Sequence, residues 1–324
     1  MTVVGLTFSK KNKVFELPCP LAPLYDTHAH LRSFWGDDKR VPAVLARAAA
    51  AGVASIVTIY DPVADLSDET PDAAAYSAWL AGELDRARAE LEANPGLTCG
   101  PELISVPSLT YLVGVHPYGA PDYSDVIHAQ GEAALADPLC AGVGEIGLDY
   151  HFDAVDDIEA APHDLQMEVM SRQLELAVER DVPVELHIRN DSGDESREAH
   201  ADALRVLERV GTPRAGCVLH CFGEDTDTMM RFVELGCHIA FGGAATFKRN
   251  DAVREAFATC PLDRLLLETD CPYMAPEPIR GLECEPAMIA QTADVLAYGR
   301  ADRTGELPVA IARALHANAS ALFG

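Results

Sequence analysis

Short apolar runs alternate with amphipathic segments along most of this chain. The runs consist mainly of Val, Ile and Leu, without the regular polar alternation of a half-exposed strand. This composition is typical of strands buried on both faces of a parallel sheet. Eight such runs occur, at residues 24–29, 53–59, 111–115, 141–146, 183–188, 216–221, 237–241 and 264–269.

The segments between these runs have the pattern of helices. Apolar residues recur in them at three- and four-residue spacing, and glycine or proline follows. In 71–93, Thr70 and Pro71 predict the cap and the first helical position, and 94–96 (Asn-Pro-Gly) predicts the end. Four further helices are expected at 164–180, 196–210, 226–235 and 286–298, the last three ending at Gly211, Gly236 and Gly299.

Eight β-α units favour an α/β fold, namely a single TIM-type (β/α)8 barrel domain spanning 1–324. A doubly wound open sheet is the alternative. Two segments fall outside the repeating plan. Residues 1–23 form an N-terminal extension with a short hairpin within 2–17, and 61–110 is a long connection that contains one helix. Long connections at the carboxyl face of a barrel often shape substrate access.

Composition narrows the possible partners and the location. The chain has 324 residues, with 51 acidic and 25 basic ones, and a formal charge of −26. Such a surface repels polyanions and anionic membranes at long range, and no broad basic stripe is visible. The charge fits either simple solubility or a salt-rich cytoplasm. No apolar run reaches 18 residues and no secretory signal is present, so we expect no membrane span. Nine cysteines without a C-x-x-C pair favour a reducing, cytoplasmic location.

Potential metal ligands lie where the predicted strands end. They are two carboxylates and four histidines, too many for one closed structural zinc site with four ligands but enough for two ions that share a carboxylate. Imidazole and carboxylate donors suit Zn²⁺, Mn²⁺, Ni²⁺ or Co²⁺, and suit Mg²⁺ less well. The six residues are His28, His30, Glu145, His187, His220 and Asp270.

The position of each candidate supports this interpretation. His28 and His30 are two residues apart, so both imidazoles project from the same face of a strand. Asp26 shares that face and could hold a ligand imidazole or the local backbone. Glu145 lies within an apolar run, where a carboxylate is costly unless it is paired or coordinated. A salt bridge to an arginine is the alternative for Glu145, and a hydrogen-bonded core position is the alternative for a single histidine such as His220.

Several motifs together resemble the TatD family of metal-dependent hydrolases and deoxyribonucleases, within the amidohydrolase-like barrels. They occur in the family's order between residues 24 and 286. Tyr118 and Cys284 depart from the family pattern, and the 61–110 connection is longer than usual, so the substrate is less constrained than the metal site. The matching stretches are DTHAHL, GVHP, GEIGLDY, PVELHIR, HCFG, ETDCPYMAP and Arg280-Gly281 before Glu285-Pro286.

The resemblance implies a first metal held by His28, His30 and Asp270 and a second held by His187 and His220. Glu145 would bridge the two divalent ions. It further implies phosphodiester hydrolysis by a metal-activated hydroxide, at the end of a DNA strand or in single-stranded DNA, with Asp270 and Glu145 as catalytic residues. The candidate substrate contacts are His116, Arg189, Arg280 and Tyr150, with Lys248 and His151 as further candidates.

Two other functions remain open. The same barrel and ions could hydrolyse a carboxylic ester, lactone, amide or aminoacyl-tRNA ester, and the acidic surface favours this alternative modestly. A non-catalytic, metal-loaded scaffold that binds a partner through 61–110 is less compatible with an intact ligand set. No obligate protein partner is evident.

Overall fold

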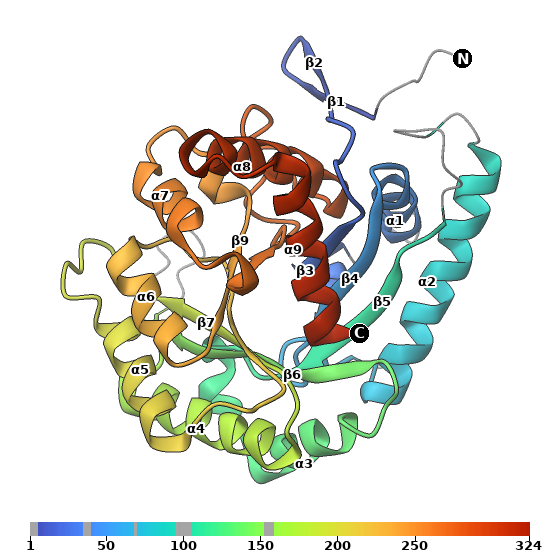
Figure 1. Cartoon of the computed structure of the whole chain (residues 1–324). Helices are drawn as coiled ribbons and strands as arrows, with labels where there is room; N and C mark the ends of the chain where they lie inside the picture. The colour runs from blue at the N-terminus through green and yellow to red at the C-terminus, as the bar shows by residue number, and fades with distance from the viewer. Residues whose placement is uncertain (1–5, 35–39, 68–69, 95–96, 98–104, 152–158) are drawn as a thin grey trace.

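The computed structural model describes residues 6–34, 40–67, 70–94, 97, 105–151 and 159–324. Its centre is a sheet of eight parallel strands, ordered in space as they are in sequence (Figure 1). The strands are β3 (Leu24–Ala29), β4 (Val53–Tyr60), β5 (Ser108–Val113), β6 (Cys140–Asp149), β7 (Val184–Arg189), β8 (Cys217–Leu219), β9 (His238–Phe241) and β10 (Leu265–Leu267).

Contacts between the first and last strands close this sheet into a barrel. Thr27 Oγ1 donates to the carbonyl of Leu267 at 3.0 Å, and the backbone N–H of Asp270 donates to the carbonyl of His28 at 3.0 Å. A parallel bridge joins Ala29 to Cys271. The predicted TIM-type barrel is therefore confirmed, and the open-sheet alternative is wrong.

Helices surround the strands, as Figure 1 shows. They are α1 (Arg40–Ala50), α2 (Ala73–Ala93), α3 (Asp125–Ala134), α4 (His163–Arg180), α5 (Glu198–Val210), α6 (Thr226–Glu234), α7 (Asp251–Thr259), α8 (Ile289–Thr304) and α9 (Pro308–Phe323). Short 3-10 turns occur at η1 (Leu31–Phe34), η2 (Pro117–Asp122), η3 (Gly243–Thr246), η4 (Leu262–Arg264) and η5 (Pro286–Met288). No helix among the described residues is both long and apolar enough to cross a membrane.

Several helix limits differ from the sequence prediction, and two of the differences have a clear physical reason. The cap of α2 is Asp72, whose side chain accepts a hydrogen bond from Ala75 N, so Thr70 and Pro71 precede the helix. Helix α8 continues through Gly299 and ends at Gly305, which adopts a left-handed conformation. A glycine within a helix costs only about 1 kcal/mol, and packing of the apolar face outweighs that cost here.

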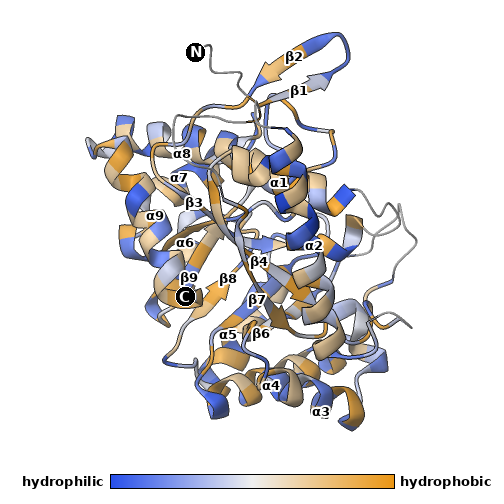
Figure 2. Cartoon of the chain, turned by 90° about the vertical axis from the view of Figure 1, so that its right-hand side faces the viewer, coloured by the Kyte–Doolittle hydropathy of each residue, from blue (hydrophilic) through white to orange (hydrophobic). Residues whose placement is uncertain are grey.

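The predicted N-terminal hairpin is present. It is an antiparallel pair, β1 (Thr7–Lys10) and β2 (Lys13–Glu16), and its base is anchored by the buried residues Leu6 and Leu17. Residues 1–5 lie outside the described part of the chain. The hairpin projects beyond the barrel in Figures 1 and 2, and its exposed turn is hydrophilic.

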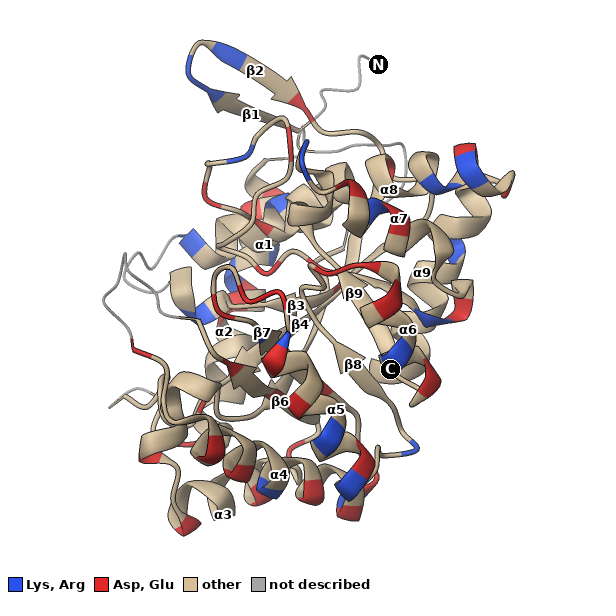
Figure 3. Cartoon of the chain, turned by 90° about the vertical axis from the view of Figure 1, so that its left-hand side faces the viewer, with Lys and Arg blue, Asp and Glu red and all other residues tan. Residues whose placement is uncertain are grey.

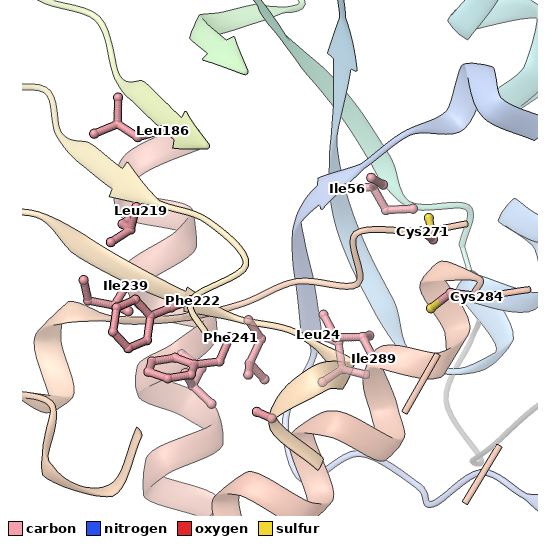
Figure 4. Packing of buried hydrophobic residues seen from close by; sticks show 14 of the residues in the cluster. Leu24, Ile56, Leu186, Leu219, Phe222, Ile239, Phe241, Cys271, Cys284 and Ile289 are labelled. Carbon is pink, nitrogen blue, oxygen red and sulfur yellow. The ribbon is translucent and has the colours of Figure 1, made fainter. Parts of the chain in front are cut away.

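Alternate residues of several strands enter two different apolar layers, because side chains on a strand point to opposite faces. On β8, Leu219 packs in the larger cluster that includes the surrounding helices, whereas Val218 belongs to a smaller cluster with Ala319 and Phe323 of α9. Figure 4 shows the packing of the larger cluster around Leu186 and Leu219. The next residue on the Val218 face of β8 is His220, so a polar layer follows the apolar one along this strand.

Strands β6 and β7 approach unusually closely at Gly147. This residue has φ +148°, and an added Cβ would lie 1.9 Å from the carbonyl oxygen of His187. Only glycine is compatible with that backbone conformation and spacing. Gly147, the second glycine of the GEIG stretch, therefore allows β6 to bring Glu145 against His187.

Candidate metal centre

The carboxylate of Glu145 lies between two pairs of imidazoles. Its Oε1 is 2.6 Å from His187 Nδ1 and 2.7 Å from His220 Nε2. Its Oε2 is 3.7 Å from His30 Nε2 and 3.8 Å from His28 Nε2. Each oxygen thus faces one pair, the arrangement expected of a carboxylate that bridges two cations.

The first pair comes from β3 and the segment that follows it. His28 Nε2 and His30 Nε2 are 3.0 Å apart, and Asp270 Oδ1 lies 3.4 Å from His30 Nε2 and 3.8 Å from His28 Nε2. His28 is fully buried, and the side chains of His30 and Asp270 retain 23% and 12% exposure. The three residues therefore offer converging donor atoms at the open end of the barrel.

The second pair comes from the ends of β7 and β8. His187 Nδ1 and His220 Nε2 are 3.1 Å apart, and both face the same oxygen of Glu145. The set of two imidazole nitrogens and one carboxylate oxygen suits a divalent transition metal such as zinc. All six predicted ligand residues are brought together, and the donor atoms fit two neighbouring cations.

The charges in this centre are strongly coupled. Burial disfavours a charged His187, but the Glu145 carboxylate outweighs this effect and raises the pKa of His187 to about 9. Burial and the field of His220 lower the pKa of His28 to about 3. Burial also disfavours a charged Glu145, yet the histidines around it hold its pKa well below the usual value. The centre therefore contains an ionised Glu145 carboxylate together with a His28 imidazole that is neutral at physiological pH.

Three carboxylates outside the predicted ligand set contact the other ring nitrogens of the histidines. Glu185 Oε1 is 2.6 Å from His28 Nδ1, and Asp149 Oδ2 is 3.1 Å from His187 Nε2. Glu268 Oε1 lies 3.6 Å from His220 Nδ1 and also accepts the backbone N–H of Cys221 at 2.6 Å. Carboxylates in such positions fix the orientation of a ligand imidazole and raise its basicity.

The sequence contained a signal for two of these carboxylates. Glu185 lies two residues before His187 on β7, and Glu268 lies two residues before Asp270 in the segment that directly follows β10. In extended backbone, residues two apart share a face, so both carboxylates were candidates to point into the barrel. Both are fully buried, and a buried carboxylate requires a partner. Asp26, by contrast, accepts the backbone N–H of His28 at 3.4 Å, the local contact considered for it. It also accepts the N–H and the hydroxyl of Thr269 across the barrel.

Two of the four candidate substrate contacts lie beside this centre. The ring of His116 is 4.5 Å from that of His187 between centroids, and burial together with His187 lowers the pKa of His116 to about 3. Its Nδ1 accepts a hydrogen bond from Tyr118 N. The side chain of Arg189 is 44% exposed, with its guanidinium 3.8 Å from Asp149. His116 also forms a third convergent group with Asp149 and His187.

The other two candidates have different surroundings. Tyr150 is buried, donates its hydroxyl to Asp202 and stacks on His163, so it does not line the mouth as expected. The sequence placed it correctly after β6 but could not specify its partners on the surrounding helices. The guanidinium of Arg280 lies over the ring of Phe247, 4.0 Å from its centroid, in a segment that follows β10.

Comparison with known proteins agrees with this geometry. The family model of TatD-related DNases matches residues 25–324. The uncharacterized metal-dependent hydrolase YabD of Bacillus subtilis is 30% identical over 275 residues, which cover 85% of this chain and 90% of that protein. A protein of Pantoea vagans named 3'-5' ssDNA/RNA exonuclease TatD is 32% identical over 65% of this chain and 76% of its own length. The crystal structure of YJJV, a TatD homologue of Escherichia coli, superposes with a TM-score of 0.68 at 30% identity, covering 94% of this chain and 98% of that one.

The barrel and its histidine and carboxylate groups define a metal-dependent hydrolase. Within that class, the chain belongs to the family of TatD-related DNases. The resemblance drawn from the sequence motifs is confirmed.

Proposed function

We propose that this protein is a nuclease that hydrolyses phosphodiester bonds at the end of a single-stranded nucleic acid, with two divalent cations as cofactors. The observation that carries the proposal is Glu145, whose two oxygens face separate histidine pairs. His28, His30 and Asp270 would hold one cation, and His187 and His220 the other. Zn²⁺, Mn²⁺, Ni²⁺ or Co²⁺ fits these donors better than Mg²⁺.

Such cations supply Lewis acidity toward a phosphoryl oxygen and lower the pKa of water. The protein's own groups then position the proton and the substrate. Burial raises the pKa of Asp270, but its hydrogen bond with His30 and the field of the histidines hold the pKa below the usual value. Asp270 is therefore ionised and can accept a proton from the attacking water.

The second oxygen of Asp270 has a separate contact. The thiol of Cys221 lies 3.7 Å from Asp270 Oδ2, and burial raises the pKa of this thiol. Cys221 therefore remains protonated and donates toward the carboxylate. This contact orients Asp270 so that its other oxygen, Oδ1, faces the histidines.

Two groups at the mouth suit a phosphate. Arg189 offers a planar fork of donors that matches phosphate oxygens. His116 is neutral at physiological pH because of its low pKa, so it contributes a hydrogen bond without a charge. The family match and the single-strand exonuclease of Pantoea vagans support nucleic acid as the substrate class.

The test is a substrate panel with a matched pair of variants. Wild-type protein loaded with each metal would be assayed on single-stranded DNA, RNA, bis(p-nitrophenyl) phosphate and a p-nitrophenyl carboxylic ester. The isosteric Glu145→Gln variant should lose about 100-fold or more of its phosphodiesterase activity, since it removes the shared carboxylate. The control is Glu175→Gln on the exposed surface of α4. Diester turnover by Glu145→Gln within a few-fold of wild type would contradict the proposal.

The charge of −26 supports one competing function, hydrolysis of a neutral carboxylic ester, lactone or amide. An aminoacyl-tRNA ester, which the same centre could also hydrolyse, is a polyanion and gains no support from the charge. The same panel separates the two. Turnover of the carboxylic ester with no cleavage of either nucleic acid would replace the nuclease proposal with this one.

A further inference from the structure

Exposed cationic residues gather on one face of this otherwise acidic molecule. We call it the basic face, and it draws on the hairpin, the connection after β9 and the connection after β10. Four of the chain's five lysines lie on it, and the fifth, Lys39, is outside the described residues. Figure 3 shows basic residues around the turn between β1 and β2. The basic face consists of Lys10, Lys11, Lys13, Lys248, Arg249 and Arg280.

Tertiary contacts bring these three segments together. Lys10 Nζ donates to the carbonyl of Pro278 at 3.3 Å, which ties the hairpin to the connection after β10. Arg280, two residues further, stacks on Phe247, the neighbour of Lys248. The backbone N–H of Glu277 donates to Thr246 Oγ1 at 2.8 Å, which joins the same two connections again. These contacts hold the three segments of the basic face together, although its residues are up to 270 positions apart in the sequence.

The charges on this face are not neutralised by neighbours. None of its six cations pairs with a carboxylate within the part of the chain that the structure describes, whereas most arginines elsewhere do. Of the carboxylates in the same segments, Glu283 and Glu285 are paired with Arg40 and Arg47. The linear sequence shows no broad basic stripe, because these cations come together only through contacts between distant segments.

Two exposed side chains, Tyr273 and Met274, lie between the basic face and the metal centre. Tyr273 is 54% exposed, and its ring lies 5.8 Å from that of His30 between centroids. Met274 beside it is 44% exposed. The carbonyl oxygen of Met274 lies directly against Gly243, since a Cβ added to Gly243 would be only 1.9 Å from that oxygen. The segment around Met274 therefore packs on the connection after β9, which contains Phe247.

We propose that the basic face binds the phosphates of a nucleic-acid single strand whose end lies at the metal centre, and that Tyr273 stacks on a base of that strand. This inference rests on the proposed nuclease function and specifies how the substrate is held. Cations that contact phosphates release counterions, and aromatic rings stack on any unpaired base. The bases of a duplex are already stacked, so an exposed tyrosine next to the catalytic carboxylate favours a single strand.

The first test removes charge from the basic face. A triple variant, Lys11→Gln, Lys13→Gln and Arg249→Gln, would be compared with Arg88→Gln, Arg231→Gln and Arg313→Gln on α2, α6 and α9. Both triples change the net charge equally, so they match in long-range electrostatics. Binding of a fluorescein-labelled, hydrolysis-resistant phosphorothioate oligothymidylate of ~15 nucleotides to the metal-loaded protein would be followed by anisotropy over a range of NaCl. The basic-face triple should reduce the slope of log Kd against log salt by about 2, since each phosphate contact contributes about 0.7.

The second test removes the aromatic ring of Tyr273. Tyr273→Ala should weaken oligonucleotide binding about tenfold, because one base loses its stacking partner. Tyr273→Phe should bind as the wild type does. Tyr298→Ala is the matched control, since Tyr298 is 47% exposed on α8.

The outcomes separate this inference from the proposed function. If the wild type hydrolyses diester and single strand while the basic-face triple binds like its control triple, the basic face is refuted and the nuclease function stands. If no substrate is hydrolysed but both binding differences are found, the nuclease function fails and the strand-binding face stands. Equal affinity of Tyr273→Ala and Tyr298→Ala would refute the stacking role alone.

Discussion

At the scale of single residues, the chemistry of this centre depends on carboxylates that would not themselves bind metal. Glu185 is fully buried, and its Oε1 lies 2.6 Å from His28 Nδ1, the ring nitrogen that faces away from Glu145. Burial raises the pKa of this carboxyl to about 8. A carboxylate there fixes which ring nitrogen of His28 faces the metal position. Glu185 therefore sets the geometry of the first cation without contacting it.

Replacing Glu185 should weaken metal binding without removing a ligand. In Glu185→Gln, the amide can still accept from His28 Nδ1 but cannot ionise, whereas the wild-type carboxyl ionises above its pKa of about 8. At pH ~9 we therefore expect affinity for the first cation to be about 10- to 100-fold lower in Glu185→Gln than in the wild type. Competition with a chromophoric chelator measures this change. The exposed Glu179→Gln on α4 is the control, and an unchanged affinity in Glu185→Gln would contradict the role.

Metal binding should also release protons. His187 has a pKa of about 9 in the metal-free protein, so it is protonated at neutral pH, and coordination requires the lone pair on Nδ1. Its interaction with Glu145 stabilises the metal-free fold fully below the ordinary histidine pKa and is lost as pH rises through about 9. Titration calorimetry in buffers of different ionisation enthalpy should detect the release of about one proton or more at neutral pH. Identical heats in all buffers would contradict it.

At the scale of elements, the contact between β6 and β7 determines the site. Glu145 and His187 meet at 2.6 Å because Gly147 leaves no side chain between the strands. At the other end of the barrel, Ala319 and Phe323 of α9 pack on the interior residues Val218 and Leu266. The polar layer thus rests on an apolar layer that α9 covers.

Gly147→Ala should be strongly destabilising. The added methyl group would meet the His187 carbonyl, and alanine does not tolerate the backbone φ at this position, so we expect a loss of about 3 kcal/mol or more in the free energy of unfolding. Gly82→Ala on α2 is the control, because no atom lies within 4 Å of its added Cβ. This control should be neutral or stabilise by about 1 kcal/mol. Urea denaturation measures both, and equal stability of the two variants would exclude the close-approach argument.

At the scale of the whole molecule, charge is distributed unevenly. The net charge of −26 opposes compaction through self-repulsion, while the six cations of the basic face have no carboxylate partner among the described residues. Burial of the apolar runs supplies the compensating stability. The surface therefore excludes polyanions in general but offers one local approach to the metal centre.

Salt should stabilise the fold as a whole. Raising NaCl from low to about 1 M shortens the Debye length to about 3 Å and screens repulsion among the acidic residues. We expect the urea midpoint of the metal-saturated protein to rise with salt. A urea midpoint that does not change with NaCl would show that repulsion among the acidic residues is negligible. It would also exclude the hypothesis that the negative charge is an adaptation to a salt-rich cytoplasm.

The sequence by itself determined the fold class, the family and the six candidate ligands. The spacing of apolar residues, and the position of a ligand residue at the end of a strand, are both local properties of the sequence. It left open the partners of Tyr150, the end of α8 and the carboxylates behind the histidines. Only the tertiary structure decided those, and only it assembled the basic face. The physical reason is that pairing across the barrel and clustering of charge depend on distances between residues that lie far apart in the chain, and those distances exist only after folding.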